Sequence, residues 1–532
     1  MRRITTLGLA ALINGGFTLV LVATSCGGST LENTFGDAGS GGGGNGGGGG
    51  GNGGGGGGNG GGGGGFGDGG GSGSGGGGSS DGGFACPAGL QCNVSCNGGG
   101  TTTVKGKVYD PAGKNPLYNV AVYVPATPLT ALPKGVLTGA DACQCGALFP
   151  SGALTNTSTA EDGSFTLSNV PVGNSVPLVL QVGKWRRLVH IPVQQCMENV
   201  EADKSLTLPG SVPAGNTDDN IPDIAVSTGS ADTLECLMLR IGLPASEFVA
   251  GTSTAGHFHV FSGGTEDGQA EQNPMPGAPP SSTALWSSQA QLMPYDIVLL
   301  SCEGEETSNA NPANLESYLN AGGRAFGSHF HYAWFSGPID GSGQTYSAPA
   351  DWGSNLANWS PNGSGGGGLT GGVIDTTLNG SPQPFGKGVS LQKWLENVGA
   401  LGKGVPAGQL SIYQPKYNAS VGPANKPSQP WITSGSNTMY FSFDTPVNAP
   451  AGPDGGVPEY CGRAVFSDLH VDGDPSTHDT PNSGGQPPPG GCSNTDLSPQ
   501  EKALEFMLFD LSSCVIPDSV APTPDAGIPV IR

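Results

Sequence analysis

The sequence predicts a multidomain protein, in which an antiparallel β-sandwich is followed by an α/β domain with a doubly wound parallel sheet. Three observations support this prediction. Between residues 103 and 182, apolar and polar side chains alternate and no helical period intervenes. From residue 221 on, short apolar strands alternate with segments of helical period. Ahead of both, a glycine tract leaves almost no apolar side chains to bury.

Composition divides the chain and limits its partners. Residues 27–84 contain 37 glycines in 58 positions, too little apolar surface to offset the entropy of ordering the backbone. A net charge of −22 with 12% charged residues argues against a nucleic-acid partner, because neutralising phosphates needs clustered Lys and Arg. The expected segments are a signal peptide (1–26), a disordered tether (27–85), a β-sandwich (86–212), an α/β domain (213–515) and a disordered tail (516–532).

The N-terminus has the features of an export signal. Two arginines precede an apolar segment at residues 7–22, and small residues precede Cys26. This pattern resembles a bacterial lipoprotein signal, which implies that Cys26 is lipidated and becomes the new N-terminus. Gly27 resembles the outer-membrane sorting pattern, so we expect an outer-membrane or cell-surface lipoprotein. The alternative is cleavage by ordinary signal peptidase and a secreted protein with a disordered arm. No later stretch approaches the 18 apolar residues of a membrane span.

The first domain reads as a series of strands. Apolar residues alternate at 104–108, 120–124 and 176–182, and the turn signals 110–113 and 162–163 separate the strands. The run VKGKVYDPAGKNPLYNVAVYV, followed by EDGSFTLSNVPVG, resembles the carboxypeptidase regulatory-like domain. The resemblance implies a prealbumin-like sandwich that serves as a structural or adhesive module without catalysis.

Twelve cysteines suit an oxidising compartment. Six cysteines lie in or beside the sandwich: Cys86, Cys92, Cys96, Cys143, Cys145 and Cys196. Their even number suggests three disulfides of unspecified connectivity. The rival interpretation is metal binding by the Cys-x-Cys pair at 143–145. Five cysteines lie in the α/β domain, so one thiol is left over there. We expect Cys461 and Cys492 to pair and close the polar loop 472–491, although a thiol can instead pair between the domains.

In the α/β domain, strands and helices alternate with clear end signals. A helix opens at Asn311-Pro312 and ends at two glycines, and another opens with the capping box Ser498–Glu501. A further helix covers the region of Leu234 to Ile241. Strands are expected at 224–226, 257–261, 297–300, 324–330 and 464–466, and residues 340–460 read mostly as loop.

Three segments resemble the class I glutamine amidotransferase-like superfamily and, within it, the ThuA-like branch. They are YDIVLLSCEGEE, NLESYLNAGGRAFGSHFHYAWF and CGRAVFSDLHV. The resemblance implies a flavodoxin-like fold. The amidotransferases carry a nucleophilic Cys on the elbow after the strand that ends here at Gly327, whereas this chain has Ser328-His329-Phe330. Glutaminase chemistry is therefore not expected, and Cys302, one strand earlier, is a poor substitute.

The histidines provide the candidate site. His329 and His331 form one pair, and Asp468 and His470 form another. On a strand, residues i and i+2 share a face, so each pair can converge on a divalent metal ion, with Glu303 at the end of a neighbouring strand. His329 and His470 also match the two histidine positions of the ThuA-like branch.

Other interpretations of the histidines stay open. The same side chains can line a pocket for a sugar or another small ligand, or they can pack structurally among aromatic residues. A third pair, His257 and His259, is equally open to a purely structural role in a strand.

Together these features predict a surface lipoprotein attached to the outer membrane through its lipid. Without the amidotransferase nucleophile, the expected role is a non-enzymatic binding or envelope protein, with an envelope component or a carbohydrate as ligand. The alternative is a metal-dependent hydrolase or other enzyme acting on extracellular carbohydrate, which the histidine and aspartate pairs favour. Fold resemblance alone does not decide between them.

Overall fold

The computed structural model describes residues 86–229, 231–263, 280–361, 363, 368–450, 458–471, 479 and 489–520. The described residues form a sheet-rich fold in which strands outnumber helices, as expected. The predictions for the signal peptide, Cys26 and the tether lie outside the described residues, as does most of the expected tail.

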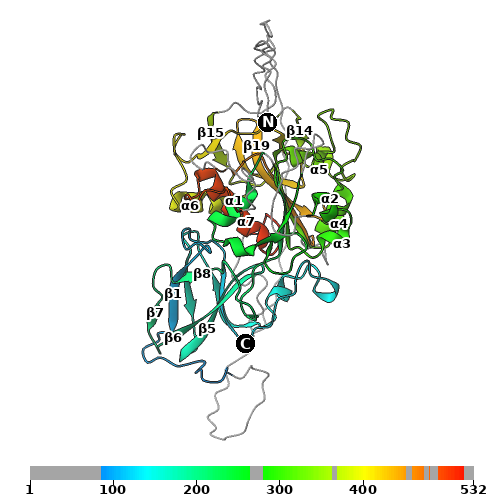
Figure 1. The fold of residues 1–532 in the computed structure, drawn as a ribbon. Helices are drawn as coiled ribbons and strands as arrows, with labels where there is room; N and C mark the ends of the chain where they lie inside the picture. Colours follow the sequence, from blue (N-terminus) through cyan, green and yellow to red (C-terminus); the bar gives the residue numbers. More distant parts are fainter. Residues whose placement is uncertain are drawn as a thin grey trace, which may run out of the picture. The chain divides into compact units, whose positions relative to one another are not determined.

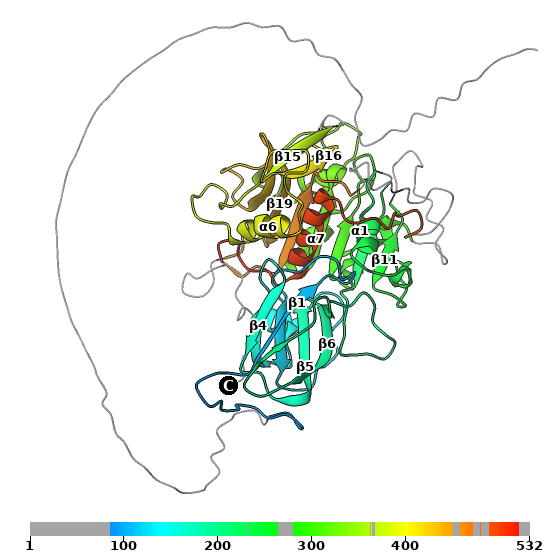
Figure 2. The same cartoon turned by 90° about the vertical axis from the view of Figure 1, so that its left-hand side faces the viewer.

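The N-terminal part contains two four-stranded sheets. The first pairs β4 (Ser164–Ser168), β1 (Thr103–Tyr109) and β7 (Glu198–Val200) in that order, and β8 (Leu206–Thr207) also pairs with β1. The second has the order β3 (Ala153–Ser158), β2 (Ala121–Pro125), β5 (Gly173–Val182) and β6 (Trp185–Val193). All its pairs are antiparallel, and Figure 2 shows β5 and β6 side by side.

The alternation in these strands explains how the sheets bury apolar surface. Val104 and Val108 of β1 belong to the same buried cluster as Val122 of β2 and Leu180 of β5. In a strand, side chains two positions apart point to one face, so each sheet contributes one apolar face to this core. The strands β3, β6, β7 and β8 were not predicted from the sequence.

A ten-stranded sheet forms the centre of the C-terminal part. Its first six strands are all parallel: β10 (Phe248–Ala250), β11 (Phe258–Phe261), β9 (Ile224–Ser227), β12 (Ile297–Leu300), β13 (Arg324–Ser328) and β20 (Gly462–Ser467). Without β10, the parallel strands lie across the sheet in the order β11, β9, β12, β13, β20. Counted by their order in the chain, these are the second, first, third, fourth and fifth. The strands predicted at 224–226, 257–261, 297–300 and 464–466 are confirmed within one or two residues.

The other four strands of this sheet are antiparallel, which corrects the expectation of a parallel sheet throughout. They are β19 (Asn437–Thr445), β18 (Ser428–Ser434), β15 (Leu369–Ile374) and β16 (Leu410–Tyr413), and Figure 2 shows β15, β16 and β19 together. A separate pair joins β14 (Asn358–Trp359) and β17 (Ala419–Ser420). The prediction that 340–460 is mostly loop is therefore wrong. Eight of the nine residues of β19 are buried, so both faces of this strand are covered.

Helices cover both faces of the large sheet (Figure 1). One face carries α1 (Leu234–Arg240), α6 (Gly386–Asn397) and α7 (Pro499–Ser512). The other carries α2 (Ser282–Leu285), α3 (Gln289–Leu292), α4 (Pro312–Asn320) and α5 (Tyr332–Ser336). Within β12, Leu299 packs in the first cluster and Val298 in the second, so both faces of this strand are buried.

Two predicted helix starts are confirmed in detail. The side chain of Asn311 accepts a hydrogen bond from the backbone N–H of Asn314, and Pro312 takes the first helical position of α4. Ser498 and Glu501 form the reciprocal capping box of α7. These side chains satisfy backbone donors that a helix start otherwise leaves without partners.

The described cysteines form five disulfides. Two lie within the N-terminal part, Cys86–Cys92 and Cys96–Cys196, and three join distant segments: Cys143–Cys461, Cys145–Cys514 and Cys236–Cys492. The predicted Cys461–Cys492 bridge is therefore wrong. Cys461 immediately precedes β20, whereas the chain reaches Cys492 only after leaving the far end of that strand. Each of the two thiols pairs with a different neighbour, Cys461 with Cys143 and Cys492 with Cys236 of α1.

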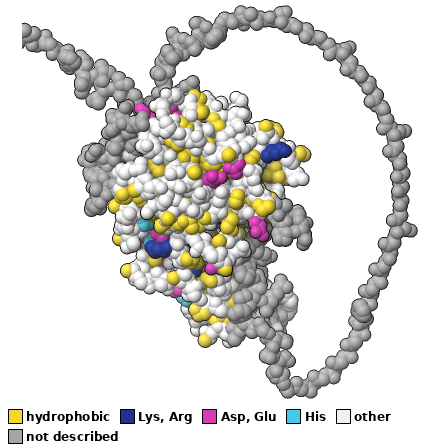
Figure 3. All heavy atoms as spheres, turned by 90° about the vertical axis from the view of Figure 1, so that its right-hand side faces the viewer, with side chains coloured by type: hydrophobic (Ala, Val, Ile, Leu, Met, Phe, Trp, Pro, Cys, Tyr) yellow, Lys and Arg dark blue, Asp and Glu magenta, His cyan; other side chains and the backbone are white. Residues whose placement is uncertain are grey.

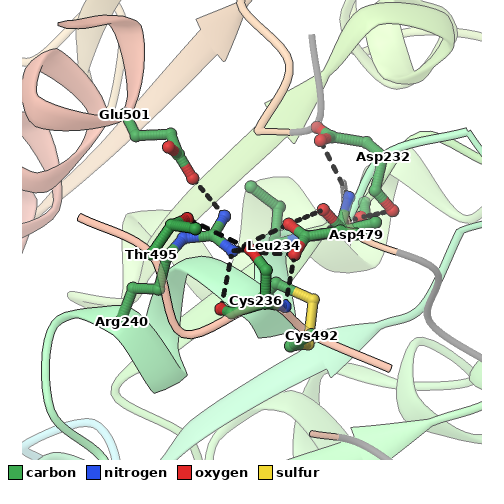
Figure 4. The surroundings of a disulfide bond; sticks show 11 residues. Asp232, Leu234, Cys236, Arg240, Asp479, Cys492, Thr495 and Glu501 are labelled. Carbon is green, nitrogen blue, oxygen red and sulfur yellow. Dashed lines mark hydrogen bonds and ion pairs between the residues drawn. A yellow bond between two sulfur atoms is a disulfide. The ribbon is translucent and has the colours of Figure 1, made fainter. Parts of the chain in front are cut away.

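Cys492 instead fastens the segment after β20 to α1. Beside this bridge, Arg240 of α1 forms ion pairs with Asp479 and Glu501, and the side chains of all three are fully buried (Figure 4). The guanidinium Nη1 lies 2.8 Å from Oδ2 of Asp479. A disulfide and a buried charge cluster thus hold α1, the start of α7 and the chain beyond β20 together.

In the part of the chain that the structure describes, no helix combines the length and the apolar character needed to cross a bilayer.

Candidate functional site

The candidate site lies where the parallel strands end. Leu300 of β12 pairs with Gly327 of β13, and Ser328 of β13 pairs with Ser467 of β20. The carboxyl ends of these three neighbouring strands therefore lie at one edge of the sheet. In doubly wound sheets, ligands bind at this edge, because the side chains that follow the strands are not covered by a helix there.

At the end of β13 the chain turns sharply. The predicted strand 324–330 ends at Ser328, and residues 329–331 form a short 3-10 turn that leads into α5. His329 has a φ of +44°, a left-handed conformation that is uncommon outside glycine. His329 and His331 therefore do not share the face of a strand, which corrects the geometry expected for this pair.

A hydrogen bond joins this turn to the neighbouring strand. The backbone N–H of Cys302 donates to Oγ of Ser328 over 3.0 Å. Cys302 follows β12 as His329 follows β13, so the bond holds the two strand ends in register. It also brings the thiol of Cys302 to the imidazole of His329, with Sγ and Nδ1 3.4 Å apart.

His470 completes a cluster of three donors. Its ring centroid lies 5.2 Å from that of His329 in an edge-on arrangement. The ligating atoms of Cys302, His329 and His470 all lie within 4.8 Å of one another, and all three residues are buried. Among the described residues, these three are the His, Cys, Asp or Glu side chains found in a group of three or more close enough to share one metal ion.

Burial sets the protonation of this cluster. It lowers the pKa of His329 well below its ordinary value, and the neighbouring His470 and Lys416 add to that shift. Burial and Lys416 lower the pKa of His470 in the same direction. Both imidazoles are therefore neutral at neutral pH and keep one ring nitrogen with a lone pair.

His331 is fully buried outside this cluster. Its Nδ1 lies 3.2 Å from the carbonyl oxygen of Ser328, so this nitrogen donates the hydrogen bond. Burial lowers the pKa of His331 to about 3. The contact closes the turn between β13 and α5, which is a structural role.

Asp468 is held by the segment that leads into β17. Its side-chain Oδ2 accepts a hydrogen bond of 2.8 Å from the backbone N–H of Asn418. Its backbone carbonyl oxygen accepts a hydrogen bond of 3.3 Å from the backbone N–H of Lys416. Burial raises the pKa of Asp468 well above its ordinary value. Through its carboxyl group and its backbone carbonyl, Asp468 anchors residues 416–418 to the end of β20.

Glu303 lies at the same sheet edge but is directed toward the end of β11. Its Oε1 is 3.0 Å from the position that a Cβ on Gly263 would take. Its charge also contributes to the raised pKa of Tyr346. Of the predicted residues, the structure thus brings His329 and His470 together and gives His331, Asp468 and Glu303 other surroundings.

The third histidine pair lies at the opposite edge, near the start of β11. Nδ1 of His257 is 2.6 Å from Oε2 of Glu247, and Nε2 of His259 is 3.2 Å from Oδ1 of Asp223. These local partners support the structural interpretation of the pair.

Sequence reasoning did not include Cys302 in the candidate site. The sequence held two indications of this role. Cys302 follows a buried strand at the place that matches His329 after the next strand. Cysteine parity also required one thiol outside the disulfides. The structure identifies this thiol by pairing every other described cysteine in a disulfide.

Comparison with known proteins identifies no relative: no protein-family model matches the chain, and no curated protein matches it significantly.

Proposed function

We propose that the protein is an exported envelope lipoprotein, anchored in the outer membrane through Cys26, whose α/β domain binds an envelope component or carbohydrate and has no glutaminase activity. The N-terminal domain is, in this proposal, a prealbumin-like module of the carboxypeptidase regulatory type. The C-terminal domain is flavodoxin-like and related to the ThuA-like amidotransferases. The strand order second, first, third, fourth, fifth is that of flavodoxin-like sheets and supports this assignment.

The residue at the elbow carries the proposal. In the amidotransferases the nucleophilic thiol occupies the sharp turn after the strand, and here that turn holds His329 with its φ of +44°. The nearest thiol, Cys302, follows the neighbouring strand and is fully buried. A glutamine side chain therefore meets an imidazole at the elbow, which does not form the thioester of glutaminases.

The disulfides support the exported location. Three of the five bridges join segments more than 250 residues apart, with separations of 256, 318 and 369. Bridges of this kind persist in oxidising compartments and are reduced in the cytosol. They suit a protein that works outside the cytoplasm.

The surface supports a ligand with little charge. On the face drawn in Figure 3, Lys and Arg side chains are few, and polar uncharged and apolar groups cover most of the described area. Such a face fits neutral polysaccharide better than an anionic polymer, which requires basic side chains.

Two measurements on the full chain test this proposal. Incubation with glutamine should release no ammonia, with a known glutaminase as positive control. Immobilised protein should retain neutral polysaccharide prepared from bacterial envelopes. Ammonia release, or failure to retain any envelope polysaccharide, would contradict the proposal.

One observation favours a second candidate, a metal-dependent hydrolase acting on extracellular carbohydrate. It is the contact of 3.4 Å between Cys302 Sγ and His329 Nδ1 at the ligand-binding edge of the sheet. This candidate predicts the release of new reducing ends from polysaccharide in the presence of divalent metal, and their loss in Cys302→Ser.

A further inference from the structure

The cluster of Cys302, His329 and His470 combines donors from three separate segments. Each residue follows a different strand of the sheet, β12, β13 or β20, and the segments meet only because these strands are neighbours. All three side chains are at least 97% buried.

The spacing fits coordination to one ion. Bonds of about 2.3 Å to sulfur and about 2.1 Å to nitrogen, at a tetrahedral angle, separate the two donor atoms by roughly 3.6 Å. Sγ of Cys302 and Nδ1 of His329 are 3.4 Å apart. No donor pair exceeds 4.8 Å, so an ion would draw the most distant pair together by roughly 1 Å.

The backbone around each donor is already held in place. Cys302 is tied to Ser328 through its N–H, and His329 sits in the turn at the end of β13. The carbonyl oxygen of His470 accepts a hydrogen bond of 2.5 Å from Nε2 of Gln500. The next N–H, that of Val471, donates to Oδ1 of Asp232 over 2.8 Å. Such fixed surroundings orient metal ligands before the ion arrives.

The donor set selects the class of ion. One thiolate and two imidazoles suit zinc and copper, whereas magnesium and calcium require oxygen ligands. Binding ionises the Cys302 thiol, whose proton passes to solvent.

We infer that Cys302, His329 and His470 form a buried site for a single late first-row transition-metal ion, either zinc or copper. This site differs from the one expected from the sequence, since it replaces His331, Asp468 and Glu303 by a cysteine. Three protein ligands leave one position of a tetrahedral ion for a further ligand.

Metal analysis of the purified full chain tests the site. After chelation and reloading with Zn²⁺ or Cu²⁺ in separate samples, we expect about one ion per chain. Cys302→Ser, His329→Asn and His470→Gln should each reduce bound metal to near zero. Asn is chosen at position 329 because it tolerates positive φ.

The matched control is His190→Asn, which removes an exposed histidine from β6. It should bind metal like the unaltered protein. If the unaltered protein binds neither ion, or if the three site variants bind as much as the control, the inference is wrong.

A spectroscopic measurement on the unaltered protein guards against variants that fail to fold. Co²⁺ bound through Cys302 should give the near-ultraviolet charge-transfer band of a thiolate ligand and the visible bands of a tetrahedral ion. Bound Co²⁺ without the thiolate band would rule out this site, and Mg²⁺ should not displace the cobalt.

Discussion

Glu505 of α7 and Asp110 at the end of β1 lie close together in the interior, and each carboxyl group influences the pKa of the other. Glu505 is fully buried, and Asp110 is 1% exposed. Two neighbouring carboxyl groups buried in this way disfavour a second negative charge, so one of them tends to keep its proton. Asn115 completes the contact by donating from Nδ2 to Oε2 of Glu505 over 2.7 Å.

This pair predicts that stability falls as pH rises. Burial, and then Asp110, raises the pKa of Glu505 well above its ordinary value of 4.5. Above that ordinary value the folded state keeps a proton that the unfolded state releases, so the stabilisation is present at acidic pH and is lost as pH rises through the folded pKa. Glu505→Gln keeps the acceptor for Asn115 and removes the charge.

We therefore expect Glu505→Gln to flatten the decrease in melting temperature between about pH 5 and pH 8. At the upper end of that range the variant should melt a few degrees above the unaltered protein. Thermal unfolding at several pH values measures this, with Glu198→Gln in an exposed ion pair as control. An unchanged pH slope in Glu505→Gln would show that the pair does not titrate in this range.

The disulfide Cys143–Cys461 should contribute more to stability than Cys86–Cys92. The first spans 318 residues and the second 6, and a bridge that closes a longer loop removes more entropy from the unfolded chain. Replacing Cys143 and Cys461 by Ala should lower the free energy of unfolding by about 2–5 kcal/mol. Denaturant unfolding of both double variants checks the order, and equal losses would contradict it.

The turn at His329 predicts different effects for two substitutions that both remove the imidazole. At a φ of +44°, glycine fits without strain, whereas a β-branched side chain does not. His329→Val should therefore be less stable than His329→Gly by about 1–3 kcal/mol. Chemical denaturation of the metal-free variants measures the difference. A Val variant as stable as the Gly variant would mean that the turn has relaxed.

Substitution of Arg240 should lower the stability of the fold more than substitution of an exposed charged residue. Arg240→Met leaves Asp479 and Glu501 buried without their counter-ion (Figure 4). Removing one partner of a buried charge cluster costs about 3–5 kcal/mol. Lys105→Met, in an ion pair whose side chains are more than 40% exposed, should change stability by less than about 1 kcal/mol. Comparable losses in both variants would contradict this difference.

Much of the fold could be predicted from short stretches of sequence. The four apolar residues 297–300 predict a buried strand, and Asn311 and Ser498 predict helix starts, because each signal depends on neighbours a few residues away. The antiparallel half of the large sheet was missed for the same reason. In β19 the alternation is short (Phe441, Ser442, Phe443, Asp444), and the place of the strand is set by its pairing with β18 and β20.

The candidate site could be predicted only in part. His329 and His470 were expected together, since both follow strands of one parallel sheet. His331 was misplaced because β13 ends one residue before the histidine pair begins, and element ends are the least reliable part of a sequence-based prediction. Cys302 was overlooked as a ligand because disulfide parity does not say which thiol is left over.

By itself, the sequence determined the sheet-rich class, the helix caps, the leftover thiol and the residues that follow each parallel strand. Only the tertiary structure decided that Cys461 pairs with Cys143 and that Cys302 meets His329 and His470. The physical reason is the range of the interactions. Caps and strand patterns arise between residues a few positions apart, whereas these contacts join residues 27 to 318 positions apart and exist only once the strands are ordered in the sheet.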